Sequence, residues 1–175
     1  MLKRKVVLVL AVPVVLGMLG ILAVAQAQSQ RAHGALTALD YAEIQQLYGR
    51  YAIGVDSGNG DMFAGAFTPD GTFELPGGKT IQGRKQLAEV PRPGGTTGPT
   101  NVSHVSVNIV IEPSPDGATG TSYFLRVKLG ESGNPSTLTG GGIYRDTFVK
   151  TSEGWRIKKR IVQPAHSVPP TTKTQ

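Results

Sequence analysis

The sequence predicts one α+β domain, with helices first and an antiparallel sheet after them. Apolar residues recur at helical spacing in the first part of the chain, and four long segments of alternating polarity follow from residue 102, separated by turns. The length of 175 residues is also that of a single domain. In this layout the first helix must bury its apolar stripe against one face of the sheet.

Residues 1–27 have the pattern of a secretory signal peptide. Three basic residues precede an apolar run over 6–24, and Ala25-Gln26-Ala27 fits the small-x-small rule for cleavage. The run is also long enough to remain as an anchor, since a membrane span needs roughly 20 residues. We therefore expect an exported protein, periplasmic or secreted, with anchoring by the uncleaved segment as the alternative. Residues 28–36 are polar and small, which predicts a linker.

The first helix is predicted to begin after Thr37, because Thr37 and Asp40 match a variant of the capping box. It should end at residues 57–60, where glycine can adopt the left-handed cap conformation. A second short helix is expected over 61–67, followed by a turn at 68–71. The expected core-facing residues of the first helix are Ile44, Leu47, Tyr48, Tyr51, Ala52 and Val55.

Strands are predicted from residue 72 onward. A short strand over 72–75 should pair with 80–82, and a helix should cover 83–90 before a Pro/Gly/Thr loop at 91–99. Four longer strands are expected over 102–112, 119–129, 138–150 and 155–163, which form an antiparallel sheet because turns join them. Residues 164–175 are predicted to be a disordered tail.

The strand at residue 102 should have one apolar and one polar face, because side chains alternate along a strand. A polar face covered by protein would be unusual unless it lines a cavity, whereas an exposed apolar row predicts a homodimer through the outer face of the sheet. The apolar row comprises Val105, Val107, Ile109 and Ile111, and the polar row comprises His104, Ser106 and Asn108.

Composition narrows the possible partners. The absence of Cys excludes disulfides and lipid attachment through cysteine. The basic run at 158–160 lies in a predicted strand, which favours a solvated strand face over a nucleic-acid site. His33 lies in the linker and His166 in the tail, so the sequence indicates no metal cluster. We expect no cofactor, no nucleic-acid partner, and membrane contact only through an uncleaved N-terminal segment.

A set of segments occurs in a characteristic order along the chain, together with His104 and Asn108: 48–58, 67–71, 81–83, 144–146 and 154–157. Through these segments, residues 37–163 resemble the SnoaL-like family of the NTF2-like superfamily, whose relatives include scytalone dehydratase, steroid isomerase and polyketide cyclases. The resemblance implies a cone in which a curved antiparallel sheet wraps around the N-terminal helix and encloses a central apolar pocket. The second strand histidine of the dehydratase has no counterpart, and neither has the aspartate-arginine-aspartate set of an epoxide hydrolase.

The resemblance implies that Asp56 and His104 occupy the helix-end aspartate and first strand histidine positions of the dehydratase-like members. As a catalytic pair, the carboxylate would hold the imidazole in one tautomer and leave its other nitrogen as a general base. Tyr51, Asn108 and Tyr144 are the expected substrate-binding residues, as donors to a developing enolate oxygen. The alternative is structural: Asp56 caps the helix and His104 bonds to backbone.

We therefore expect a pocket protein for a small, mostly apolar molecule. If it is an enzyme, it should be a cofactor-independent lyase or isomerase that uses acid-base chemistry. The alternatives from the sequence are a ligand-binding module without turnover and a protein-interaction module, because this fold hosts enzymes and non-enzymes alike.

Overall fold

The structure, a computed structural model, describes residues 35–93, 95, 101–131 and 133–164. A compact unit begins at Leu36. The predicted signal segment at 1–27, most of the linker and nearly all of the tail lie outside the described residues, so those predictions stay open. Within the described ranges, no helix is long and apolar enough to cross a membrane.

Helix α2 (Ala38–Asp56) begins at the predicted capping box. The Asp40 amide donates to Thr37 Oγ1 and the Thr37 amide donates to Asp40 Oδ2. Asp40 Oδ1 also accepts hydrogen bonds of 2.7 Å from Lys150 Nζ and Trp155 Nε1, which tie the helix to the sheet. The hydrogen bonds from Lys150, Thr37 and Trp155 hold the pKa of Asp40 well below its usual value.

A short helix, α3 (Gly60–Gly65), follows, and strand β1 (Phe67–Glu74) pairs with β2 (Thr80–Gln82) before helix α4 (Arg84–Glu89). The predicted turn at 68–71 was wrong, because these residues belong to β1. They form an irregularity in the register between Phe67 and Thr72, where Pro69 and Gly71 interrupt the regular pairing with β6. Proline and glycine mark a bulge as readily as a turn.

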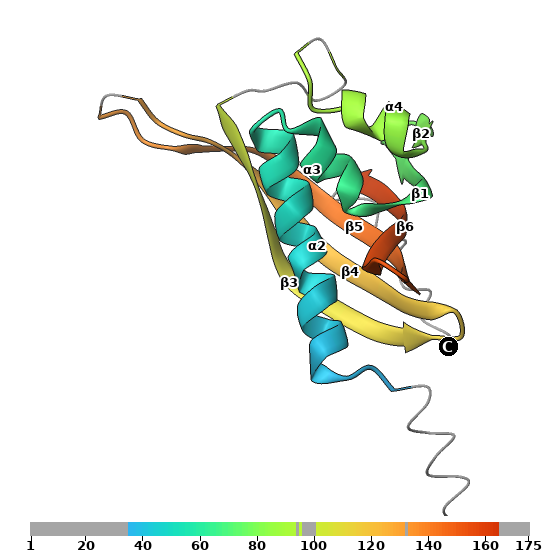
Figure 1. Cartoon of the computed structure of the whole chain (residues 1–175). Coiled ribbons are helices and arrows are strands. Elements are labelled where there is room, and N and C mark those ends of the chain that lie inside the picture. Colours follow the sequence, from blue (N-terminus) through green and yellow to red (C-terminus); the bar gives the residue numbers. More distant parts are fainter. Residues whose placement is uncertain (1–34, 94, 96–100, 132, 165–175) are drawn as a thin grey trace, which may run out of the picture. The chain divides into compact units, whose positions relative to one another are not determined.

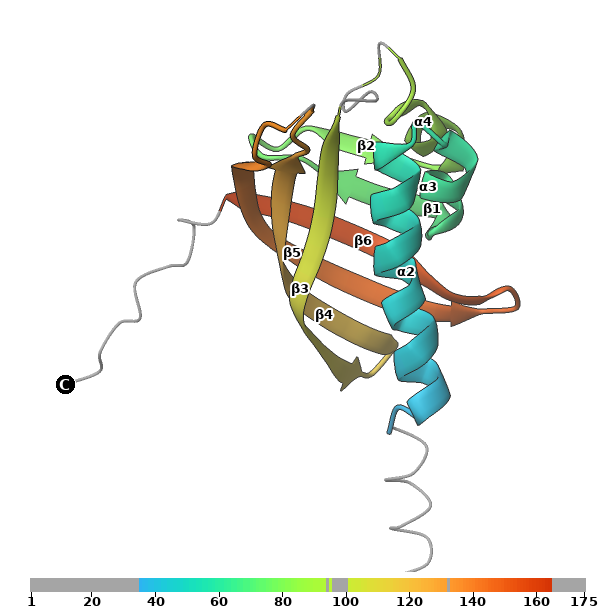
Figure 2. The same ribbon diagram turned by 90° about the vertical axis from the view of Figure 1, so that its left-hand side faces the viewer.

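The four predicted long strands are present as β3 (Val102–Ser114), β4 (Gly117–Lys128), β5 (Thr137–Thr151) and β6 (Gly154–Pro164). They form an antiparallel meander within one six-stranded sheet of order β2-β1-β6-β5-β4-β3. The sequence did not predict that β1 pairs with β6 in parallel. The sheet curves around α2 without closing (Figures 1 and 2), which confirms the α+β cone.

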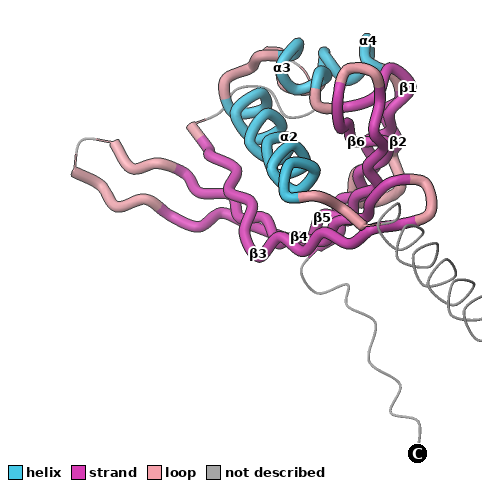
Figure 3. The backbone as a smooth tube through the Cα atoms, turned by 60° about the horizontal axis from the view of Figure 1, so that its bottom comes forward, coloured by secondary structure: helices cyan, strands magenta, loops and turns pink. Residues whose placement is uncertain are grey.

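The core lies between α2 and the concave face of the sheet. Figure 3 shows the sheet bent around α2, with β3 and β4 below the helix in this view. Five of the six predicted stripe residues of α2 are at most 3% exposed, and they pack against aromatic residues from β1 and β5. The five are Ile44, Leu47, Tyr48, Tyr51 and Val55.

A bulge in β3 corrects the predicted faces of that strand. Its register with β4 shifts between Val107 and Val110, and Asn108 adopts a left-handed backbone with φ of 52°. Val105 is exposed on the outer side, whereas Ile109 and Ile111 pack against the core. The predicted continuous apolar row was therefore wrong, because one extra residue reverses the alternation.

Candidate functional site

Asp56 and His104 meet where the end of α2 packs against the start of β3. Asp56 Oδ1 lies 2.6 Å from His104 Nδ1, and Asp56 Oδ2 accepts the His104 backbone amide at 2.8 Å. Both side chains are mostly buried, with exposed fractions of 22% and 16%. Against an ionised carboxylate, this contact requires the tautomer with the proton on Nδ1, which leaves the lone pair of a neutral ring on Nε2.

His104 lines a cavity of about 250 Å³ between the open ends of the curved strands. Tyr51 and Tyr144 line the same cavity, so the structure brings three of the five predicted site residues to one cavity, with Asp56 directly behind His104. The remaining lining is mostly apolar, a composition typical of small-molecule sites. It comprises Phe73, Leu75, Pro76, Phe124, Arg126, Gly141, Val162, Gln163 and Pro164.

Asn108, the fifth predicted site residue, is exposed at the β3 bulge and does not line this cavity. The bulge removes it from the alternation that places His104 inward.

Sequence reasoning missed the aromatic and basic lining contributed by β4. Phe124 stacks on Tyr144 with ring centroids 4.3 Å apart, and Arg126 is the register partner of His104. Alternation along β4 from Ser122 was the available signal, since Ser122 and Phe124 are both buried.

A buried ion pair supports the tyrosines of the cavity. Arg160 donates two hydrogen bonds of 2.8 Å to Asp146, and both side chains are fully buried. The Arg160 guanidinium carbon lies 4.2 Å from the ring centroids of both Tyr51 and Tyr144. The prediction that 158–160 forms a solvated face was therefore wrong for Arg160, because Asp146 and the tyrosine rings replace its water.

Burial determines the protonation of these groups. Desolvation raises the pKa of Tyr51 and raises that of Tyr144 well above its ordinary value, so both stay neutral hydrogen-bond donors at physiological pH. Burial opposes the charge of Arg160, but the Asp146 carboxylate outweighs it and raises the Arg160 pKa. The cavity is thus lined by the neutral phenols of Tyr51 and Tyr144, and the charged guanidinium of Arg160 packs against both rings.

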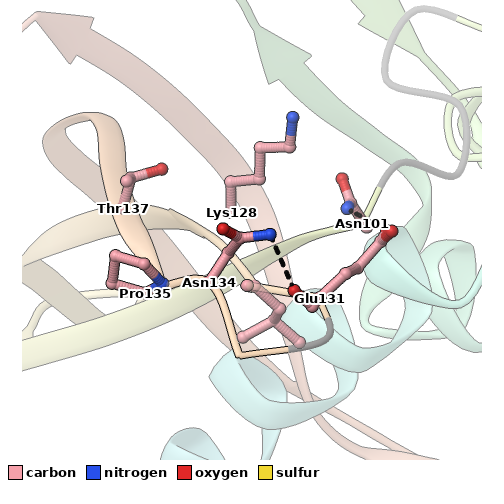
Figure 4. Close-up of a pocket in the computed structure, with 8 residues that line it drawn as sticks. Asn101, Lys128, Glu131, Asn134, Pro135 and Thr137 are labelled. Carbon is pink, nitrogen blue, oxygen red and sulfur yellow. Dashed lines mark hydrogen bonds between the residues drawn. The ribbon is translucent and has the colours of Figure 1, made fainter.

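A second hollow, of about 310 Å³, lies at the loop between β4 and β5 (Figure 4). Asn134 Nδ2 donates to the Glu131 carbonyl within it, and Asn101 and Lys128 complete its polar side. It shares no lining residue with the His104 cavity. Among the described residues, no group of three His, Asp or Glu side chains could hold a metal ion.

Comparison with solved structures places this fold among known proteins. A Mycobacterium tuberculosis protein of unknown function is 29% identical, with a TM-score of 0.58 over 75% of this chain and 78% of the other. An NTF2-like protein with a cystatin-like fold from Novosphingobium aromaticivorans is 21% identical, with a TM-score of 0.64 over 82% and 90%.

A Catenulispora acidiphila protein in complex with S-DNPA is 25% identical, with a TM-score of 0.62 over 73% of this chain and 95% of the other. A search of curated proteins gives no match. The sequence profile of the SnoaL-like domain matches residues 36–161, which is most of the chain. The protein therefore belongs to the SnoaL-like family.

Proposed function

We propose that the protein is a cofactor-independent lyase or isomerase that removes a proton beside a carbonyl group of a small, mostly apolar molecule. The contact of 2.6 Å between Asp56 and His104, with His104 on the wall of the cavity, carries this proposal. The ligand-bound relative supports small-molecule binding in this fold.

His104 Nε2 is the general base in this mechanism. No described residue hydrogen-bonds to Nε2, and the Nδ1 proton is held by Asp56, so Nε2 is free to accept the substrate proton. The C–H bonding pair becomes the enolate, and Tyr51 and Tyr144 donate hydrogen bonds to its oxygen. The imidazolium then returns the proton in one of two ways. In an isomerisation, a β,γ double bond of the substrate is conjugated with the enolate and its γ-carbon takes the proton; in an elimination, the proton goes to a departing β-hydroxyl, which leaves as water.

Hydrogen exchange at carbon tests the proposal without knowledge of the natural substrate. Small cyclic ketones and β-hydroxyketones are incubated with the protein in D₂O, and deuterium incorporation beside the carbonyl is followed by NMR. Wild type should accelerate exchange, and His104→Ala should lose roughly 100-fold or more of that rate. Ser106→Ala, two residues further along the same strand and outside the cavity lining, is the matched control. An undiminished rate in His104→Ala would exclude His104 as the base.

Ligand binding without turnover is the alternative, and one feature favours it. Asp56 also accepts the His104 backbone amide, a contact that fixes the end of α2 to β3 whether or not chemistry occurs. A cavity that binds apolar ligands while His104→Ala leaves their chemistry unchanged would establish this alternative.

Export belongs to the same proposal, with the leader at 1–27 removed or retained as an anchor. Intact-mass measurement of the native protein distinguishes the two, since a mass that includes Met1 means an anchor.

We also propose a homodimer through the outer sheet face, where Val105, Val110 and Tyr123 are 41%, 56% and 49% exposed. Val105→Lys with Tyr123→Lys should yield folded monomers in sedimentation, whereas Gln45→Lys, at an exposed position of α2, should not. A monomeric wild type would contradict the dimer.

A further inference from the structure

Arg126 gives the His104 cavity a charge that the rest of its lining lacks. Among the twelve residues that line the cavity, Arg126 alone carries a permanent charge, and no carboxylate is in the lining. Within the described ranges, its guanidinium makes no ion pair and no side-chain hydrogen bond. Most other described arginines have such a partner: for example, Arg84 and Arg156 both pair with Glu153.

The position of Arg126 is fixed by strand register. Arg126 on β4 lies directly opposite His104 on β3 and opposite Gly140 on β5. A directly opposed pair shares one face of the sheet, with Cβ atoms about 5 Å apart. Arg126 therefore stands on the same wall as the candidate base, toward the exposed end of the cavity.

Gly140 leaves the space that the guanidinium occupies. A Cβ atom at Gly140 would lie 3.0 Å from Arg126 Nη2 and 3.3 Å from Nε, closer than ordinary side-chain contacts. The next residue, Gly141, lines the cavity itself. Glycine at position 140 thus admits the arginine beside the site.

We infer that the cavity takes an apolar molecule that bears a carboxylate, and that Arg126 is the specificity-determining residue that binds it. This inference rests on the proposed function of the cavity as a small-molecule site. A guanidinium without a protein partner matches a carboxylate with two parallel hydrogen bonds. Phe73, Phe124 and Val162 would contact the apolar body of the same ligand.

The orientation of the ligand follows from this anchor. With its carboxylate on Arg126, the adjoining carbons lie toward His104 on the neighbouring strand. The two tyrosine hydroxyls then remain for an uncharged oxygen of the ligand. Charge selection and proton removal are thus assigned to different residues of one wall.

Binding of a matched pair of probes tests this inference. The dissociation constants of 2-naphthoate and its uncharged isostere 2-naphthamide are measured by calorimetry for wild type, Arg126→Gln and Arg126→Lys. Arg50→Gln, an exposed arginine of α2 that does not line this cavity, is the control. Wild type should prefer the acid by about tenfold or more, because hydrogen bonds between charged partners are the strong ones.

In Arg126→Gln, the ratio of the dissociation constants of amide and acid should fall to near one, with the affinity for the amide unchanged. Arg126→Lys should keep part of the preference for the acid. Circular dichroism checks that the variants are folded. Two results would overturn the assignment of Arg126 while the cavity remains a binding site. One is an equal ratio of the two dissociation constants in wild type and in Arg126→Gln, and the other is a wild type that prefers the amide. Failure of wild type to bind either probe at millimolar concentration would overturn the small-molecule site itself.

Discussion

The buried ion pair of Arg160 and Asp146 should contribute strongly to the stability of the residues around the cavity. In Asp146→Asn the guanidinium keeps at most one of its two hydrogen bonds to this side chain and loses its counter-charge. Removal of one partner of a buried pair costs about 3–5 kcal/mol, because the other charge is left unpaired in the interior. Against a total stability of about 5–15 kcal/mol, that is a large fraction.

The predicted loss corresponds to a fall in melting temperature of roughly 12 °C for a domain of this size. Thermal and urea unfolding, followed by circular dichroism, measure it, and unchanged urea m-values would show that the unfolded state is the same. The double variant Asp146→Leu with Arg160→Met is the control. It should lose less stability than Asp146→Asn, because it leaves no buried charge.

A loss below about 1 kcal/mol in Asp146→Asn would refute the reasoning. It would mean that water reaches Arg160 and that no buried cation supports Tyr51 and Tyr144.

Three further predictions follow from the same packing. The free energy of unfolding should fall as pH rises above about 10. Burial raises the pKa of Tyr48, Tyr51 and Tyr144 in the folded state, so the unfolded chain releases these protons first. Absorbance titration near 295 nm should detect their ionisation only on unfolding. Stability should also fall as pH drops below about 4, because the Asp40 pKa is lowered in the folded state, and Asp40→Asn should reduce this acid dependence in urea titrations. Gly142→Ala should destabilise the domain by about 1–3 kcal/mol in urea unfolding, since its Cβ would lie 2.7 Å from the Phe124 ring and against the Gln163 carbonyl, whereas Gly49→Ala should be tolerated because nothing lies within 4 Å.

Local chemistry made the helices predictable. The capping box at Thr37 and the period of the apolar residues of α2 require only near neighbours in sequence, and both are present in the structure. The four long strands were predictable for the same reason, since alternation and turn residues are local signals.

Interactions between distant segments were not predictable from pattern. Nothing in the periodicity places Asp56 beside His104, 48 residues away; only the family resemblance indicated the two positions. The bulge at Asn108 changes the face of every later residue on β3, and it is visible only in the register with β4. Arg126 was missed for the same reason, because its place opposite His104 is a property of strand pairing.

Burial of charge was the other failure of pattern. Three consecutive basic residues at 158–160 indicated a solvated surface, yet Arg160 is fully buried. Its partner Asp146 lies on a neighbouring strand, and the tyrosines that enclose it come from α2 and β5. The sequence alone does not indicate that these residues lie together in the folded protein.

The protonation of His104 tests the acid-base pair most directly. Long-range ¹H–¹⁵N correlation NMR on the neutral ring, assigned by comparison with His104→Ala, distinguishes the two tautomers. The proposed pair predicts a proton on Nδ1, held by Asp56, and an unprotonated Nε2 whose shift changes when a ligand enters the cavity. A proton on Nε2, or an Nε2 shift that no cavity ligand alters, would contradict the role of His104 as the general base.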